Sequence, residues 1–314
     1  MHKLIFDTDI GTDVDDLLAL SFMLASPEVD VLGITTAYGD TYLRAKIVRR
    51  ALEITGQTDI PIAAGPRNTF AGIREVWMAG HEGDNARISE RSDSFLHPLN
   101  APEFILETIR AHPGEVVLCA VAPLTNLAHA CEKDLETMRQ VKHVYMMGGV
   151  FGFNNPSLTF PSAEHNIRSD PEAARVVFEA GLPITLFPLD VTLQTPLASL
   201  DVTQIKSAGT PLAAFLDAEM STWLRFIKAR FNRDQIFLHD PLTVAAIVDA
   251  GIVTRSLEVG IQIECQGEIT SGATVPHRSA NKETVEVVME VDLSRFYELY
   301  LARAAGPQVS EPTR

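Results

Sequence analysis

Acidic side chains crowd one short stretch near the N-terminus of this 314-residue chain. Five carboxylates fall within ten residues, and they are Asp7, Asp9, Asp13, Asp15 and Asp16. Carboxylates this close repel one another unless a cation neutralises them or some of them take up protons. Amides at a helix N-terminus could stabilise one or two of them, but hardly all five. Because hard oxygen ligands suit calcium or magnesium, we favour a metal site; a solvated acidic turn with Asp13 as helix cap is the alternative.

Two later groups of polar residues could complete such a site. His239 and Asp240 precede Pro241, and Glu164 and Asn166 lie in a loop. Asp240 could add a third carboxylate to the metal, with His239 in the same pocket. Adjacent residues of an extended segment point in opposite directions, so both can serve one site only where the backbone turns, as Pro241 indicates. A His-Asp pair is also a common chance dipeptide, so alone it carries little weight.

Short apolar strands alternate with helical stretches along most of the chain. The first strand is the apolar run before the acidic turn, and further strands are predicted at 29–36, 60–64, 115–121, 143–147 and 182–189. Helices are predicted from the acidic turn to about 25 and at 44–55, 101–111, 123–132, 211–231, 242–248 and 295–304, and another starts at 169–172. This alternation predicts an α/β fold with an open, mostly parallel central sheet flanked by helices. Two alternating stretches, 259–265 and 284–290, predict a small antiparallel strand pair near the C-terminus.

No linker divides the chain, so we expect one large domain over 1–304 and a disordered tail at 305–314. Ligands of such sheets bind outside the carboxyl ends of the strands. The acidic turn and Asp40 both follow strand ends and could therefore converge on one crevice. The segment 66–100 is irregular, which is typical of functional or mobile connections. Its His81 could cover the crevice or could simply be solvated.

Charge and composition restrict the partners. A net charge of −15 argues against nucleic acid or an anionic membrane, because both bind basic patches. A neutral small molecule remains compatible with this charge, and the absence of a phosphate-cradling glycine loop favours an unphosphorylated one. The chain contains no apolar run of membrane-spanning length. It enters a strand directly after Met1, so we expect no signal peptide and a cytoplasmic protein.

Seven motifs follow one another over residues 4–250. They are Asp7-Thr8-Asp9 with Asp15-Asp16, Ile34-Thr35-Thr36, Pro123-Leu124-Thr125-Asn126-Leu127-Ala128, Met146-Met147-Gly148-Gly149, Pro161-Ser162-Ala163-Glu164-His165-Asn166, Asp170-Pro171-Glu172-Ala173-Ala174 and His239-Asp240. In this order the chain resembles the nucleoside hydrolase family of inosine-uridine type ribohydrolases. The resemblance implies a tightly held calcium ion and hydrolysis of the N-glycosidic bond of ribonucleosides, which gives ribose and free base. It also implies a homodimer or a homotetramer.

The resemblance further implies a role for each matching residue. The expected metal ligands are the carboxylates of Asp9, Asp16 and Asp240 and the carbonyl of Val121. Asp15 is similar to the aspartate that activates the attacking water, and His239 could protonate the departing base. The other matches are implied to lie near the substrate: Glu164 and Asn166 at the sugar hydroxyls, Met147 against the ribose, Asp40 near the sugar and base, and His81 near the leaving base.

Three departures from the family pattern leave alternatives open. The acidic turn has two residues more between Asp9 and Asp15 than the shortest family form, so Asp13 is an alternative metal ligand or base. Glu82 follows His81 where relatives often have glycine. The polar residue expected before Pro161 is either Asn154 or Asn155. The base pocket falls in the stretches 66–95 and 220–238, and the preference for purines or pyrimidines stays open.

The residues fit the implied reaction. Glycosidic cleavage passes through an oxocarbenium-like state, which a water-activating base and a leaving-group acid both assist.

Two rival functions start from the same acids. A metal-dependent phosphohydrolase also begins with Asp-x-Asp after a strand, but it requires threonine or valine where this chain has Gly11, and a downstream lysine motif. A non-catalytic nucleoside- or sugar-binding protein would need a signal peptide and two comparable lobes, and neither is evident.

Overall fold

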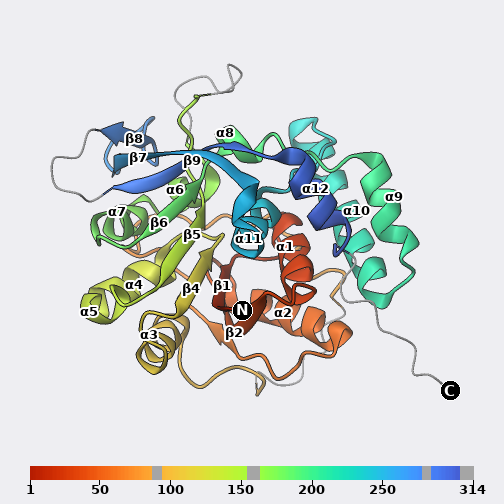
Figure 1. Cartoon of the computed structure of the whole chain (residues 1–314), viewed down its shortest axis with the longest axis horizontal. Helices are drawn as coiled ribbons and strands as arrows, with labels where there is room; N and C mark the ends of the chain where they lie inside the picture. The colour runs from red at the N-terminus through yellow and green to blue at the C-terminus, as the bar shows by residue number, and fades with distance from the viewer. Residues whose placement is uncertain (87–93, 154–162, 278–283, 305–314) are drawn as a thin grey trace.

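The computed structural model describes residues 1–86, 94–153, 163–277 and 284–304. Within these residues, nine strands form one sheet in the order β3-β2-β1-β4-β5-β6-β9-β7-β8 (Figure 1). Neighbouring strands among the first six pair in parallel, and these are β1 (His2–Thr8), β2 (Val29–Thr36), β3 (Ile62–Ala64), β4 (Val116–Ala120), β5 (His143–Met147) and β6 (Ile184–Phe187). The predicted α/β fold with a mostly parallel sheet is therefore confirmed.

The C-terminal strands extend this sheet beyond β6. β9 (Val285–Val291) pairs in parallel with β6, and β7 (Val253–Ile263) pairs antiparallel with β9. β8 (Thr274–His277) pairs antiparallel with β7 and is an additional strand. The predicted antiparallel pair near the C-terminus corresponds to β7 and β9.

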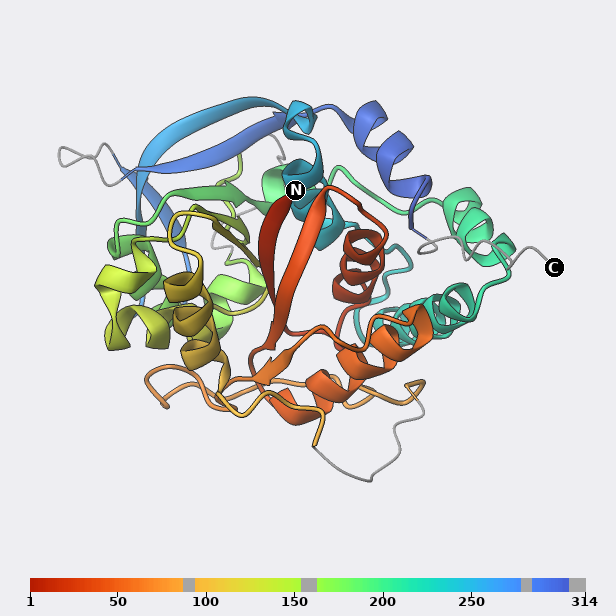
Figure 2. The ribbon, with the colours of Figure 1, turned by 60° about the horizontal axis from the view of Figure 1, so that its bottom comes forward.

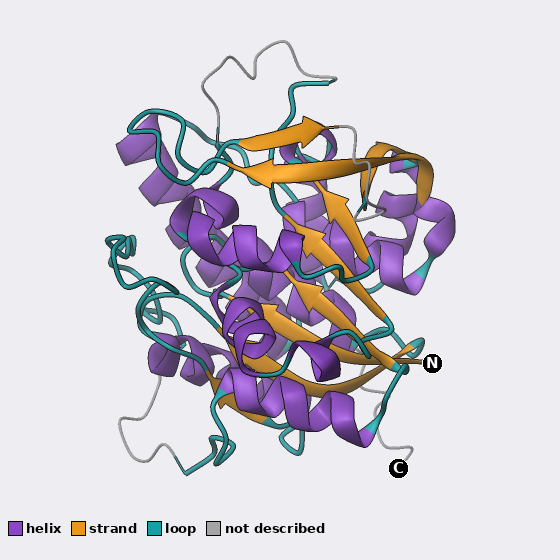
Figure 3. Ribbon diagram, turned by 90° about the vertical axis from the view of Figure 1, so that its left-hand side faces the viewer, coloured by secondary structure: helices purple, strands orange, loops and turns teal. Residues whose placement is uncertain are grey.

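Helices cover both faces of the sheet (Figures 2 and 3). The first face packs against α1 (Asp15–Leu24), α2 (Thr41–Thr55), α8 (Leu189–Thr192), α9 (Ser199–Ser207), α10 (Pro211–Phe231), α11 (His239–Val248) and α12 (Leu293–Leu301). The second face packs against α3 (Ala101–Ala111), α4 (Thr125–Lys133), α5 (Leu135–Met138), α6 (His165–Ser169) and α7 (Pro171–Glu179). A short 3-10 turn, η1 (Ala250–Ile252), joins α11 to β7.

The apolar run of β1 reflects this double cover. Leu4 and Phe6 contribute to the core on the first face, and Ile5 between them contributes to the core on the second face. Successive side chains of a strand point to opposite faces, so a strand that is buried on both faces is continuously apolar. The same reason explains why the buried strands could be predicted as apolar runs.

The strand order predicts a ligand site beside β1. The chain moves from β1 outward to β2 and β3, and then returns to place β4 on the other side of β1. Connections that leave in opposite directions separate at this switch point, and ligands of open α/β sheets bind there, outside the carboxyl ends of the strands. The acidic loop, residues 9–14, follows β1, and Val121 follows β4.

Some details differ from the expectations. α2 begins at Thr41, before the predicted 44, because the Asp40 side chain accepts a hydrogen bond from the Leu43 amide and caps the helix. Asn154, Asn155 and the tail 305–314 lie outside the described residues. Among the helices of the described ranges, none combines the length and the apolar character that crossing a bilayer requires.

Candidate metal and active site

Two helix N-termini bring three acids together. Asp15 and Asp16 form the start of α1, Asp240 lies in the first turn of α11, and the two helices pack against each other (Figure 1). Carboxylate oxygens of these three buried residues lie within 4.8 Å of one another. Neither helix start carries a side-chain cap, so its free amides and its dipole favour negative charge at this point. We call Asp15, Asp16 and Asp240 the acid cluster.

The acid cluster has the donor set of a hard divalent cation. Burial and the neighbouring carboxylates raise the pKa of all three aspartates well above the usual value. Such crowding is unfavourable without a counter-charge, and oxygen-only donors suit calcium or magnesium rather than softer metals. The predicted convergence of the N-terminal acids with Asp240 is present in the structure. His239 and Asp240 are the first two residues of α11, so the backbone turns there as Pro241 indicated. That both side chains serve one pocket stays a prediction.

Asp9 and Asp13 flank the acid cluster on the same loop. Asp9 is buried, its charge contributes to the raised pKa of Asp16, and its Oδ2 lies 3.9 Å from Nη2 of Arg44. Asp13 is partly exposed, and its Oδ1 accepts a hydrogen bond of 2.6 Å from the Val14 amide. The expected ligand role of Asp9 and the choice between Asp13 and Asp15 as the base stay predictions.

A second group of predicted site residues lies at the ends of β4 and β5 and at the start of α6. We call these residues, Val121, Met147, Glu164 and Asn166, the second wall of the site. The Asn166 side-chain amide donates to the Val121 carbonyl at 3.0 Å and to the Met147 carbonyl at 3.3 Å. The Glu164 carboxylate accepts from the amides of Gly149, Asn166 and Ile167 at 2.7–3.1 Å. Burial raises the pKa of Glu164 to about 7, although these amides partly offset the rise. The structure therefore joins the four predicted residues Val121, Met147, Glu164 and Asn166 into one hydrogen-bonded group.

The two predicted histidines sit in different surroundings. Nδ1 of His239 lies 2.7 Å from Oγ1 of Thr192, and burial lowers the pKa of His239 to about 4. Nε2 of His81 lies 2.9 Å from the Thr12 carbonyl, which can only accept, so this nitrogen carries the proton and Nδ1 is left for other contacts. The His81 ring centroid is 5.1 Å from that of Phe226 and 6.1 Å from that of Trp223. His81 thus belongs to an aromatic group with α10.

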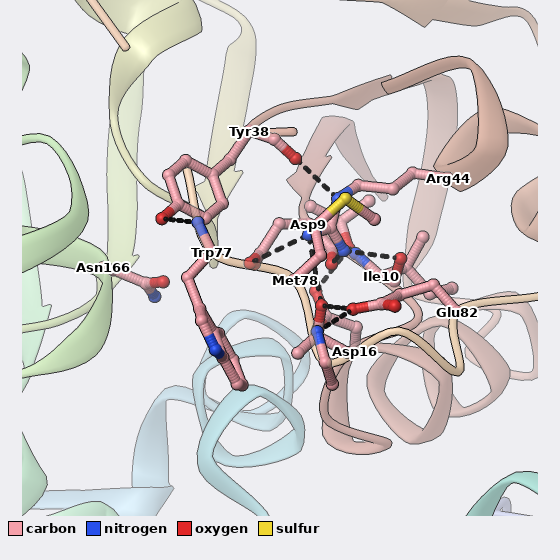
Figure 4. Close-up of polar contacts among 12 residues, drawn as sticks. Asp9, Ile10, Asp16, Tyr38, Arg44, Trp77, Met78, Glu82 and Asn166 are labelled. Carbon is pink, nitrogen blue, oxygen red and sulfur yellow. Dashed lines mark hydrogen bonds and ion pairs between the residues drawn. The ribbon is translucent and has the colours of Figure 1, made fainter. Parts of the chain in front are cut away.

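Asp40 lies at the N-terminus of α2. Besides capping α2, its carboxylate forms an ion pair of 3.1 Å with Arg67, and the side chains of Asp40 and Arg67 are 41% and 57% exposed. Close by in sequence, Tyr38 has a positive φ of 63°, and its hydroxyl accepts a hydrogen bond of 2.9 Å from the Trp77 amide. Figure 4 draws Trp77 between Asn166 and the acidic loop.

Several residues that shape the site had no assigned role in the sequence. Asp7 is fully buried and accepts from Thr35 at 2.5 Å and from Asn126 at 2.7 Å, which ties β1 to β2 and α4. Arg44 is also fully buried and donates to the acidic loop. A signal for Arg44 exists, because it continues the apolar stripe of α2 at 47, 48, 51 and 52, where a charged residue must be paired.

The fold and this site together define an α/β protein with a buried group of aspartates, able to hold a metal ion, at the switch point of a mostly parallel sheet. The family model of the inosine-uridine preferring nucleoside hydrolases matches residues 4–298. The pyrimidine-specific ribonucleoside hydrolase RihA of Salmonella arizonae is 33% identical over 96% of this chain and 97% of its own.

Solved structures agree with this assignment. A plant nucleoside hydrolase, PpNRh1, superposes with a TM-score of 0.86 at 30% identity and covers 98% of this chain and 99% of its own. A purine-preferring ribonucleoside hydrolase from Gardnerella vaginalis gives a TM-score of 0.80 at 27% identity, covering 96% of this chain and 98% of its own. The chain therefore belongs to the inosine-uridine preferring nucleoside hydrolase family, whose members hydrolyse N-glycosidic bonds of ribonucleosides.

Proposed function

We propose that this chain hydrolyses ribonucleosides with a bound calcium ion and with Asp15 as the general base. The observation that carries the proposal is the acid cluster, in which carboxylates from two helix N-termini lie within 4.8 Å of one another. Asp16, Asp240, Asp9 and the Val121 carbonyl would hold the ion. When bound, calcium supplies positive charge that orients the attacking water and the ribose hydroxyls and eases loss of a proton from that water.

Asp15 would accept the proton of the attacking water. It adjoins Asp16 in the chain and faces Asp240 across the acid cluster, so its carboxylate lies beside the oxygens assigned to the ion. A base must reach the proton that it removes, and this position satisfies that requirement better than the partly exposed Asp13. The surrounding carboxylates would also stabilise positive charge as it develops on the ribose.

The second wall would hold the sugar. Glu164 and Asn166 would bind the ribose hydroxyls, and Met147 would pack against the ring. Asp40 would lie near the sugar and the base. Glu164 and Asn166 are fixed by hydrogen bonds to backbone groups, which suits residues that must orient a substrate before the reaction.

His239 and His81 would lie at the leaving base. A pKa of about 4 makes His239 neutral at pH 7 before substrate binds. A neutral imidazole is a poor proton donor, so the role of His239 as leaving-group acid requires the bound nucleoside to raise its pKa. The Nδ1 atom of His81 is available to accept a hydrogen bond from the base.

The test is ribose release from inosine, uridine and adenosine, with and without a chelator. Both purine and pyrimidine nucleosides are needed, because the relatives named above differ in the base they prefer. We expect turnover that chelation abolishes and added calcium restores. Phosphate release from nucleotides would favour a phosphohydrolase, and tight binding without turnover would favour a binding protein.

Asp15→Asn and Asp13→Asn form a matched pair for the base. We expect Asp15→Asn to lower kcat by at least about a hundredfold while the protein stays folded, and Asp13→Asn to retain most of the activity. The reverse outcome would assign the base to Asp13. The expected cytoplasmic location and homodimer or homotetramer remain predictions for cell fractionation and for sedimentation.

A further inference from the structure

The acidic loop, residues 9–14, is not shaped by its own bonds alone. The start of α1 has no side-chain cap at Val14. Gly11 has a φ of +113°, a backbone conformation that glycine adopts at no steric cost. Repulsion between the carboxylates of the loop and of the acid cluster favours an opened loop. Contacts from other segments must therefore hold the loop in place.

Arg44 of α2 provides the first contact. Its guanidinium is fully buried and donates to the carbonyls of Asp9 and Ile10, the latter at 2.9 Å, and to Oγ1 of Thr12 at 3.2 Å (Figure 4). Its Nε donates to the Tyr38 carbonyl at 2.7 Å. A rigid planar donor with this many acceptors fixes the backbone path on its side of the loop.

Thr12 is the point where three segments meet. Its hydroxyl accepts from Arg44 and donates to Oε1 of Glu82 at 2.9 Å, and its carbonyl accepts from Nε2 of His81 at 2.9 Å. The series Arg44, Thr12 and Glu82 therefore joins α2, the acidic loop and the turn at 79–82. We call this series the loop clamp.

Glu82 is a strong acceptor for the clamp. Its Oε1 also accepts from the Ala79 amide, and its Oε2 accepts from the Gly80 amide, both at 2.7 Å. Burial by itself raises the pKa of Glu82, but these amides and the Thr12 hydroxyl outweigh that effect and lower the pKa. The carboxylate is thus ionised at neutral pH, and its bond to Thr12 is charge-assisted.

We propose that Thr12 and Glu82 are positioning residues for hydrolysis, which hold the acidic loop in the shape that lets Asp9 share one ion with Asp16 and Asp240. The inference rests on the proposed function. Neither side chain belongs to the acid cluster, and both act through the backbone of the loop. His81 precedes Glu82 and donates to the Thr12 carbonyl. The loop clamp therefore also links the residues proposed to hold the ion to the histidine proposed to contact the leaving base.

The test compares Thr12→Val, Thr12→Ser, Glu82→Gln and the Thr12→Val/Glu82→Gln double variant. Calcium affinity measured by calorimetry and kcat and KM for the best nucleoside are the readouts. Removing an outer partner of a metal site typically costs 10–100-fold in affinity or activity, so we expect about a tenfold weaker calcium affinity and a lower kcat in Thr12→Val. Thr12→Ser keeps the hydroxyl, so its calcium affinity and kcat should stay within about twofold of the wild-type values. The double variant should lose less than the two single losses combined, because both changes act on the shared bond between Thr12 and Glu82.

Thr137→Val is the matched control. Thr137 is as buried as Thr12 and donates to a carboxylate, that of Asp134 at 2.6 Å, but it lies on α5, away from the acid cluster (Figure 1). This variant should keep calcium affinity, kcat and KM. Unchanged affinity and kcat in Thr12→Val, no recovery in Thr12→Ser, or additive losses in the double variant would overturn the inference.

Amide hydrogen exchange of residues 9–14 in calcium-free protein separates this inference from the proposed function. We expect faster exchange in Thr12→Val than in the wild type, and no change in Thr137→Val. If the wild type releases no ribose but the exchange still differs, the proposed function fails while the clamp stands. If the wild type is active and Thr12→Val exchanges its amides at the wild-type rate, the loop clamp is contradicted while the proposed function stands.

Discussion

At the scale of single residues, the chemistry depends on charges that the fold forces together. Asp15, Asp16 and Asp240 come from two helices, and all three are buried. Arg44 balances part of this charge from behind the loop, but its guanidinium is engaged by backbone carbonyls. The cluster therefore keeps an excess of negative charge, which the proposed ion would neutralise.

His239 gives a residue-scale prediction. If His239 protonates the departing base, His239→Ala should lower kcat for inosine or uridine by about 10²–10³-fold. A 4-nitrophenyl riboside, whose leaving group needs no proton, should lose much less. Steady-state kinetics on both substrates measure the difference. Equal losses on the two would show that His239 does not act as the leaving-group acid.

At the scale of elements, α10 lies opposite the acidic loop. A cavity of about 10 Å³ lies between them and is lined by Asp13, His81, Glu219 and Trp223, among others. Oε1 of Glu219 is buried and has no hydrogen-bond partner among the residues that the structure describes. Burial raises the pKa of Glu219 to about 7, an effect that Asn85 partly offsets. The helix therefore carries a carboxyl group that stays protonated in the folded protein up to about pH 7.

This preference predicts a pH-dependent stability. Between the ordinary pKa of a glutamate, about 4.3, and its folded value, the native state holds a proton that the unfolded state has lost, so stability falls as the pH rises. Glu219→Gln removes this dependence. The free energy of unfolding of Glu219→Gln minus that of the wild type should rise by about 2–3 kcal/mol from pH 5 to pH 8.

Urea unfolding in the presence of a chelator measures this difference, with the exposed Glu298→Gln as control. The control should show no such rise. A difference for Glu219→Gln that stays constant between pH 5 and pH 8 would mean that the carboxyl group ionises normally in the folded protein.

At the scale of the whole molecule, the sheet order explains why distant acids meet. β1 lies in the interior of the sheet, and α1 and α11 pack together over the first face. The C-terminal strands β9 and β7 continue the same sheet beyond β6, so the last part of the chain belongs to the same body as the acidic loop. This arrangement suits a site whose parts lie far apart in the sequence.

Much of this architecture could be predicted from the sequence, and the failures have physical reasons. Buried parallel strands are apolar on both faces, and long helices have a clear period, so β2, β5, α3 and α10 match their predicted bounds. α5, α6 and α8 have only four or five residues, too few to show a period. The Asp-rich turn and Asp240 were predicted from residue type and from family motifs. The bond between Thr12 and Glu82 could not be, since it joins residues that no local pattern connects.

The central claim is that acids far apart in the sequence bind one divalent ion. Calorimetric titration of the chelator-treated protein with calcium tests it most directly, in the wild type, in Asp240→Asn and in Asp170→Asn. Asp170 is the control because its carboxylate is also buried at a helix start, that of α7, and it bonds to Thr125 and Phe70 rather than to the acid cluster. We predict one ion per chain in the wild type and in Asp170→Asn, and at least about tenfold weaker binding in Asp240→Asn. Calcium binding by Asp240→Asn with wild-type affinity and stoichiometry would contradict the account.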